Sequence, residues 1–206
     1  PIGEEICKAL AVFSLASLID SKKRGFQVGF TVGLGFALLE NLQYILFSLF
    51  AGEVVALSYG LTTVVRGIGS IPGHAMWTAC SGYAIGHILE QRKQTQQIPD
   101  VSHWDLTNPL NPSSSSKSPS GAQYTQQSLF SKSSNLQLPT SFPVMLSIAM
   151  FGHAFWNGSS VLMSYISRSL DPVSGLLAEL VWIVVLIALL WTVGRFVIAA
   201  AMEEQI

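Results

Sequence analysis

Six polar side chains stand inside long apolar stretches of this 206-residue chain. An ionisable group at bilayer depth costs about 3 kcal/mol on insertion scales, so each of them is a candidate functional residue. Carboxylates, imidazoles and an amide from separate segments are the groups that acid–base catalysis uses. The candidates are Glu4, Glu5, Glu40, His74, His153 and Asn157.

Glycines at helical spacing predict how these groups are turned inward. Gly25, Gly29 and Gly33 recur every four residues, and Phe36 and Glu40 continue the same helix face. Small residues at this spacing mark the face on which membrane helices approach closely, so we expect Glu40 to face protein rather than lipid. Two further faces follow the same design: His74, Thr78, Gly82 and Gly86 share one, and His153, Asn157, Ser160 and Ser164 share the other.

The composition indicates that the bilayer is the solvent of this chain. Hydrophobic residues make up 50% of it and charged residues 11%, with a mean hydropathy of +0.45. A helix needs about 20 mostly apolar residues to cross the hydrocarbon core, which predicts an all-α, polytopic transmembrane helix bundle of four to five apolar segments. They are residues 4–20, 25–50, 54–89, 142–166 and 172–202, and the third is broken by GIGSIPG at 67–73.

A polar segment and the basic residues predict the topology. From about residue 90 to 140 the chain is rich in Ser, Gln, Asn and Pro, so we expect a disordered loop within a single integral-membrane domain, residues 1–206. Basic residues at 21–24 and 91–93 predict that this loop is cytoplasmic in a multi-pass protein of the plasma membrane.

The net charge of −1 gives no reason to expect nucleic acid. Since PIGEEICKAL shows no signal peptide, we expect an N-terminally incomplete chain.

The polar residues also form an ordered set of motifs. EEICK at 4–8, GFALLEN at 35–41, Arg66 before HAMWT at 74–78, and HAFWN at 153–157 follow one another in this order. By these motifs the chain resembles the PrsW-type intramembrane proteases, distant relatives of the CAAX prenyl endopeptidases and bacteriocin-immunity proteases. The resemblance covers every apolar segment except the last. It implies hydrolysis of peptide bonds in membrane-anchored protein substrates, within or beside the lipid bilayer.

The resemblance also implies roles for individual residues. We expect Glu4 or Glu5 to be the general base that takes a proton from water, assisted by Glu40 and His74. His153 and Asn157 would hold the water and stabilise the oxyanion. Adjacent helix residues point about 100° apart, so only one of Glu4 and Glu5 is expected to face the site. The supporting residues of this prediction are Lys8, Asn41 and Arg66.

Two alternatives to this metal-free mechanism, which uses no cofactor, stay open. Glu40, His74 and His153 would supply two imidazoles and a carboxylate to a Zn²⁺-dependent version of the same hydrolysis, although no HExxH motif is present. In a different class, the bundle is a non-catalytic membrane scaffold or a proton-coupled transporter. Transporters usually carry paired repeats of broken helices, and this chain has one break and no repeat. The isolated charged residues His87, Glu179 and Arg195 are interpreted as structural.

Overall fold

The chain forms only helices over the residues that the structure describes. The structure, a computed structural model, describes residues 1–48, 55–96 and 137–203. In these ranges the elements are α1 (Ile2–Ser14), the 3-10 helix η1 (Ala16–Leu18), α2 (Lys22–Ser48), α3 (Val55–Val65), the π-helical turn η2 (Arg66–Ser70), α4 (Ile71–Gln96), α5 (Phe142–Ser167) and α6 (Pro172–Glu203). The prediction of an all-α fold is confirmed.

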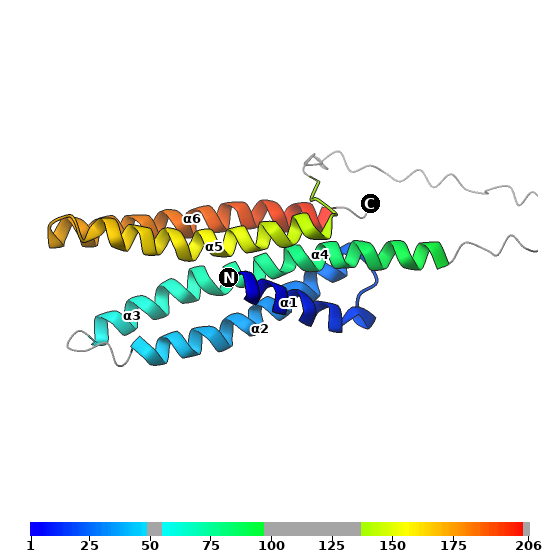
Figure 1. Ribbon diagram of the computed structural model, residues 1–206, viewed down its shortest axis with the longest axis horizontal. Helices are drawn as coiled ribbons and strands as arrows, with labels where there is room; N and C mark the ends of the chain where they lie inside the picture. Colours follow the sequence, from blue (N-terminus) through cyan, green and yellow to red (C-terminus); the bar gives the residue numbers. More distant parts are fainter. Residues whose placement is uncertain (49–54, 97–136, 204–206) are drawn as a thin grey trace, which may run out of the picture.

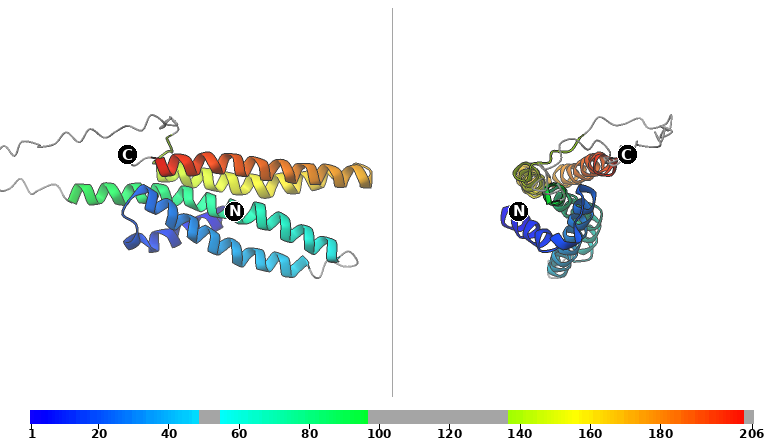
Figure 2. Two further views of the ribbon diagram at one scale, coloured as in Figure 1. Left: turned by 180° about the vertical axis from the view of Figure 1, so that it is seen from behind. Right: turned by 90° about the vertical axis from the view of Figure 1, so that its right-hand side faces the viewer.

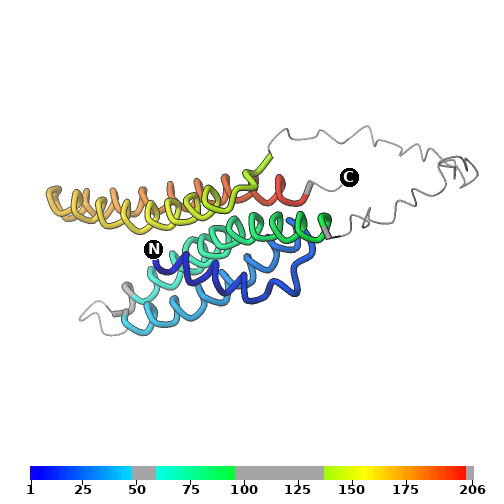
Figure 3. The backbone as a smooth tube through the Cα atoms, turned by 45° about the vertical axis from the view of Figure 1, so that its right-hand side comes forward, coloured from blue at the N-terminus to red at the C-terminus, as the bar shows by residue number. Residues whose placement is uncertain are grey.

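The long helices lie in two layers (Figure 1). α5 and α6 run antiparallel and pack on α4, which packs in turn on α2. The short α1 lies against α2, α4 and α5, so the first residues of this chain lie halfway along the bundle (Figures 1 and 2). Figure 3 shows that the α2–α3 pair and the α5–α6 pair diverge toward the end that holds the α5–α6 turn.

α2 and α4 pack through the predicted glycine faces. A Cβ atom on Gly29 would lie 2.5 Å from the carbonyl oxygen of Thr78, so no larger residue fits there without moving the backbone. Because the two backbones touch directly, the helices are held at a fixed separation. We call this contact the glycine seam; its members are Gly25, Gly29, Gly33, Gly82 and Gly86.

The GIGSIPG break is a change of helix type. Over Arg66–Ser70 the backbone forms a π-helical turn, and the residues on both sides keep right-handed helical angles. Pro72 has no N–H to give to the carbonyl of Ile68, four residues earlier. The indole Nε1–H of Trp191 in α6 donates to that carbonyl instead, at 2.9 Å. The α-helix is interrupted as predicted, but the chain stays helical through the interruption.

Two helices are long and apolar enough to cross a membrane, namely Lys22–Phe47 and Pro172–Met202. Of the four to five predicted apolar segments, these two are the candidate spans by length and composition among the described residues, and the larger number is not confirmed. α1 and α3 have 13 and 11 residues, too few for a hydrocarbon core of about 30 Å. α4 and α5 have the length, but their histidines, serines and amides lower their hydropathy. Their crossing stays a prediction.

The distribution of side chains is the reverse of that in a water-soluble domain. Leu39, Phe151 and Tyr165 are more than 70% exposed on the outside of the bundle. Lys8 and His153 are at most 2% exposed inside it. Exposed apolar surface of this extent is costly in water and favourable in lipid.

The basic ends of two helices meet at one end of the bundle. The backbone N–H of Lys22 donates to the Glu90 carboxylate at 3.4 Å, and Lys93 Nζ donates to the Ile19 carbonyl at 3.2 Å. Most of the predicted disordered loop at about 90–140 lies outside the described residues, but α4 continues as a helix to Gln96. The α5–α6 turn lies where the sequence predicted it, between Ser167 and Pro172.

Candidate active site

A chain of hydrogen bonds and ion-pair contacts joins four helices at the centre of the bundle. His74, on α4, has Lys8 Nζ at 2.8 Å from its Nδ1 and Glu40 Oε2 at 2.9 Å from its Nε2. Since an ammonium group only donates, Nδ1 accepts, and the proton of a neutral His74 then lies on Nε2, which faces Glu40. Lys8 also donates to Glu5 Oε1 at 2.7 Å. The same oxygen lies 2.9 Å from Nδ1 of His153 on α5.

His153 has one nitrogen left without a hydrogen bond. Glu5 Oε1 accepts a hydrogen bond from its Nδ1–H, and in the neutral imidazole Nε2 then carries a lone pair. Nε2 lies 3.7 Å from Glu4 Oε2, and both atoms are buried without a hydrogen-bond partner in the described part of the chain. Two acceptors at this distance need a donor or a cation between them.

Both glutamates of EEICK therefore reach His153, which differs from the expectation that only one faces the site. Glu5 is fully buried and contacts Nδ1, whereas Glu4 lies at the edge of the cluster and approaches Nε2. The two nitrogens lie on different sides of the imidazole ring, and this ring stands between the two carboxylates. The other oxygen of Glu4 is 3.5 Å from the amino group of Pro1.

Aromatic rings fix the orientation of both histidines. Trp77 stacks on His153 with ring centroids 4.9 Å apart, and Phe36 stacks on His74 at 5.7 Å. A Cβ atom on Gly152 would lie 2.6 Å from Trp77 Nε1, so glycine provides the space for the indole. Sequence reasoning did not assign Trp77 to the site. Its signal was the spacing of three from His74, which places both on one helix face.

Arg66 approaches the same oxygen of Glu40 as His74 does. Its Nη2 is 3.3 Å from Glu40 Oε2, and its Nε–H donates to Asn41 Oδ1. The guanidinium lies 3.8 Å from the centre of the Tyr44 ring. The π-helical turn that begins at Arg66 thus presents this side chain to α2, and Asn41 and Tyr44 support it.

Asn157 lies outside the hydrogen-bonded cluster. It is one helical turn beyond His153 on α5, but it is exposed and makes no side-chain hydrogen bond to another described residue. It lines a cavity of about 430 Å³ together with Arg66. The structure therefore brings five of the six predicted residues into one cluster and places Asn157 at its border.

The donors at the centre fit a divalent cation. Among the described residues, ligand atoms of Glu4, His74 and His153 lie within 4.8 Å of one another. Glu4 Oε2 and His153 Nε2 are open, whereas His74 would exchange its contact with Lys8 or Glu40 for the metal. Glu40, which the sequence indicated as the carboxylate ligand, is paired with His74 and Arg66 instead.

An apolar exterior around a buried carboxylate–histidine cluster defines a helical membrane protein with an enzyme-like centre. A family model described as PrsW family intramembrane metalloprotease matches residues 1–105. The chain belongs to this family, so it is a member of a group of intramembrane proteases. The match includes Glu4, Glu40 and His74 and ends before His153. Comparisons with curated proteins and with solved structures gave no match.

Proposed function

We propose that this chain is an endopeptidase that hydrolyses peptide bonds of membrane-anchored proteins with a water molecule activated by glutamate. The observation that carries the proposal is the pair of buried acceptors, Glu4 Oε2 and His153 Nε2, 3.7 Å apart. A water molecule that donates to both would be held beside a carboxylate able to take its proton. Family membership supports the reaction class.

In this mechanism Glu4 is the general base. Its carboxylate takes a proton from the water while the water oxygen attacks the carbonyl carbon of the scissile bond. The protonated Glu4 then gives this proton to the leaving amide nitrogen as the carbon–nitrogen bond breaks. Glu5 holds His153 through Nδ1, so that the lone pair of Nε2 stays directed at the water.

The remaining residues hold the centre and stabilise charge. Glu40, His74 and Lys8 form one chain of polar contacts that ends at Glu5 and anchors it. Asn157, one turn from His153, would donate its amide to the oxyanion. Its unpartnered, exposed state leaves that amide free for the substrate.

A Zn²⁺-dependent version of the same hydrolysis is the second candidate, favoured by the cluster of Glu4, His74 and His153. Zn²⁺ held there would polarise the scissile carbonyl and increase the acidity of a bound water. A metal assay on the purified chain tests this candidate. If the chain contains stoichiometric zinc, and a chelator removes this zinc and the activity together, the zinc-dependent mechanism replaces the metal-free one.

We also propose that the protein lies in the plasma membrane with the 90–140 segment in the cytoplasm. The meeting of Lys22 with Glu90 and of Lys93 with Ile19 supports a common end for both basic clusters. Cytoplasmic ends of membrane proteins carry such clusters. Protease access to an epitope inserted in the segment, in inverted and right-side-out vesicles, measures this placement.

The central experiment is co-expression with a single-span protein that carries a different tag at each end. We expect cleavage by the unchanged chain and its loss, by about 10³-fold or more, in Glu4→Gln and His153→Ala. Glu90→Gln is the matched control, because this carboxylate lies at the basic end of α4, away from the cluster. Normal cleavage by both cluster variants would refute the proposal.

A further inference from the structure

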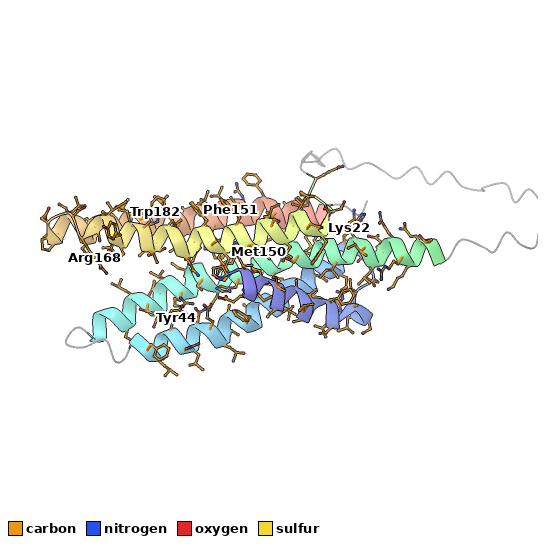
Figure 4. The ribbon with its side chains drawn as sticks, viewed as in Figure 1. Lys22, Tyr44, Met150, Phe151, Arg168 and Trp182 are labelled. Carbon is orange, nitrogen blue, oxygen red and sulfur yellow. The ribbon has the colours of Figure 1, made fainter. Side chains whose placement is uncertain are left out.

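The cavity beside the catalytic cluster has walls from both halves of the bundle. Its volume is about 430 Å³, and Tyr44 and Arg66 line it from α2 and η2. Asn157 and Glu179 line it from α5 and α6, and Trp182 lies one turn beyond Glu179. Figure 4 labels Tyr44 in the lower helix layer and Trp182 in the upper one. The cavity thus lies between the two helix pairs that diverge in Figure 3.

This cavity adjoins the catalytic cluster. Arg66 belongs to both, because it pairs with Glu40 and also lines the cavity wall. Asn157 lines the cavity from a position one turn beyond His153. A polypeptide cleaved beside His153 would therefore place the residues next to its scissile bond in this cavity.

Two polar groups of the cavity lack a partner of the kind that each favours: a buried indole N–H without an acceptor and a half-buried carboxylate without a cation. Trp182 Nε1 is buried and donates to no acceptor in the described ranges. Glu179 accepts a hydrogen bond from the Ser167 hydroxyl, but no Lys, Arg or His of the described residues pairs with it. A carboxylate without a cation is costly in a membrane protein, so a bound cation would be favoured.

The charge and the aromatic walls together indicate what the cavity would take. The positive charge of Arg66 is already balanced by Glu40 at 3.3 Å and lies against the Tyr44 ring. Of the two charged residues that line the cavity, Arg66 thus has a partner of opposite charge, and Glu179 has none among the described residues. Trp156 and Trp182 add ring surfaces, which attract ammonium and guanidinium groups. A bound peptide carbonyl would accept from the free indole N–H.

We propose that this cavity is a specificity pocket for a lysine or arginine side chain of the substrate polypeptide, with Glu179 as its charge partner. The inference rests on the proposed function, because it assigns the substrate of the same site. Glu179 is then a specificity-determining residue. Sequence reasoning interpreted it as structural because it stands alone in α6.

The test uses the purified full chain in phosphatidylcholine vesicles and a set of internally quenched peptides. Each peptide carries Lys, Met or Glu at one position near a common cleavage site. At one of the positions, we expect the peptide with Lys to have a kcat/KM about tenfold higher than the peptide with Met. Glu179→Gln should bring this ratio close to one, and Glu179→Lys should favour Glu over Lys. Asp171→Asn, which changes a carboxylate outside the cavity, should keep the preference of the unchanged chain.

The same peptides separate failure of the pocket from failure of the proteolysis. Their binding to the Glu4→Gln variant, measured by fluorescence anisotropy, reports the Lys preference without turnover. Absence of that preference, or its persistence in a Glu4→Gln/Glu179→Gln variant, would overturn the pocket. Preferential binding that depends on Glu179, without cleavage of any peptide by the unchanged chain, would support the pocket and overturn the proposed function.

Discussion

Two helix contacts of the bundle differ in how closely they are packed. α2 and α4 touch backbone to backbone along the glycine seam, whereas η2 and the α5–α6 pair leave a cavity of about 430 Å³ between them. The seam carries Glu40 and His74, which must keep their spacing. The cavity side carries Asn157 and Glu179, which have unused hydrogen-bonding capacity. The groups that set the geometry and the groups that would meet a substrate therefore lie at different helix contacts.

The largest effect is expected where the seam is broken. Gly29→Leu would force a side chain against the Thr78 carbonyl, which a Cβ atom alone would approach to 2.5 Å. We expect a loss of about 3 kcal/mol or more in the free energy of unfolding, and loss of cleavage with it. Gly35→Leu is the matched control, because nothing lies within 4 Å of its Cβ position. Equal unfolding curves for the two variants would contradict the role of the seam.

A smaller loss is expected where the two halves meet at His153. Trp77→Ala removes the ring stacked on this imidazole at 4.9 Å, so the lone pair of Nε2 loses its direction. We expect kcat to fall about 10- to 100-fold while KM changes little. Trp77→Phe keeps a ring and should recover most of kcat. A fall confined to KM would show that Trp77 binds substrate rather than orienting His153.

The attachment of α6 to the π-helical turn should contribute less. Trp191→Phe removes the indole N–H that donates to the Ile68 carbonyl, and we expect a cost of about 1 kcal/mol in unfolding. Trp182→Phe is the control, since its N–H has no partner among the described residues. Adding Pro72→Ala to Trp191→Phe restores a backbone donor for Ile68 and should recover stability. No recovery would mean that the bond does not compensate for Pro72.

The smallest effect concerns the start of α6, outside the spanning segment. Hydrogen bonds from the Ser174 side chain, and from the backbone N–H groups of Ser174 and Val173, lower the pKa of Asp171. A lowered pKa in the folded state stabilises the fold above the unfolded pKa, and this contribution is lost as the pH falls through the folded pKa.

Thermal unfolding of the unchanged chain and of Asp171→Asn measures this contribution. The difference in melting temperature should be small at pH 7, should start to shrink as the pH falls below the usual pKa of about 3.9, and should vanish once the pH is below the lowered pKa of the folded state. A difference that is independent of pH would mean that the charge of Asp171 contributes nothing.

Much of the packing could be predicted, because the spacing of residues along the chain determines which side chains share a helix face. Gly25 to Glu40 follow one face, and this face is the one that meets α4. The contact of Glu40 with His74 follows from the same periodicity. Where composition decides, as for the apolar exterior, prediction and structure agree as well.

Other features depend on how helices are placed relative to one another, which local spacing does not encode. The depth and rotation of α1 bring both Glu4 and Glu5 to His153 and make Glu4, rather than Glu40, the carboxylate beside both histidines. The bond from Trp191 to Ile68 joins residues 123 positions apart. In the sequence Glu179 is an isolated charge, and only the fold shows that it lines a cavity.

The side chains at the centre also have a net charge. The side chains of Glu4, Glu5 and Glu40 carry three negative charges, and those of Lys8 and Arg66 carry two positive ones. With both imidazoles neutral, and with the terminal amino group beside Glu4 left out, these side chains are one positive charge short of neutrality. In a largely buried centre such an imbalance favours uptake of one cation, and in the proposed mechanism the attack of water on a peptide bond would release a proton at this position. Bond cleavage would therefore supply the missing charge, and transfer of that proton to the leaving amine would return the centre to its starting state.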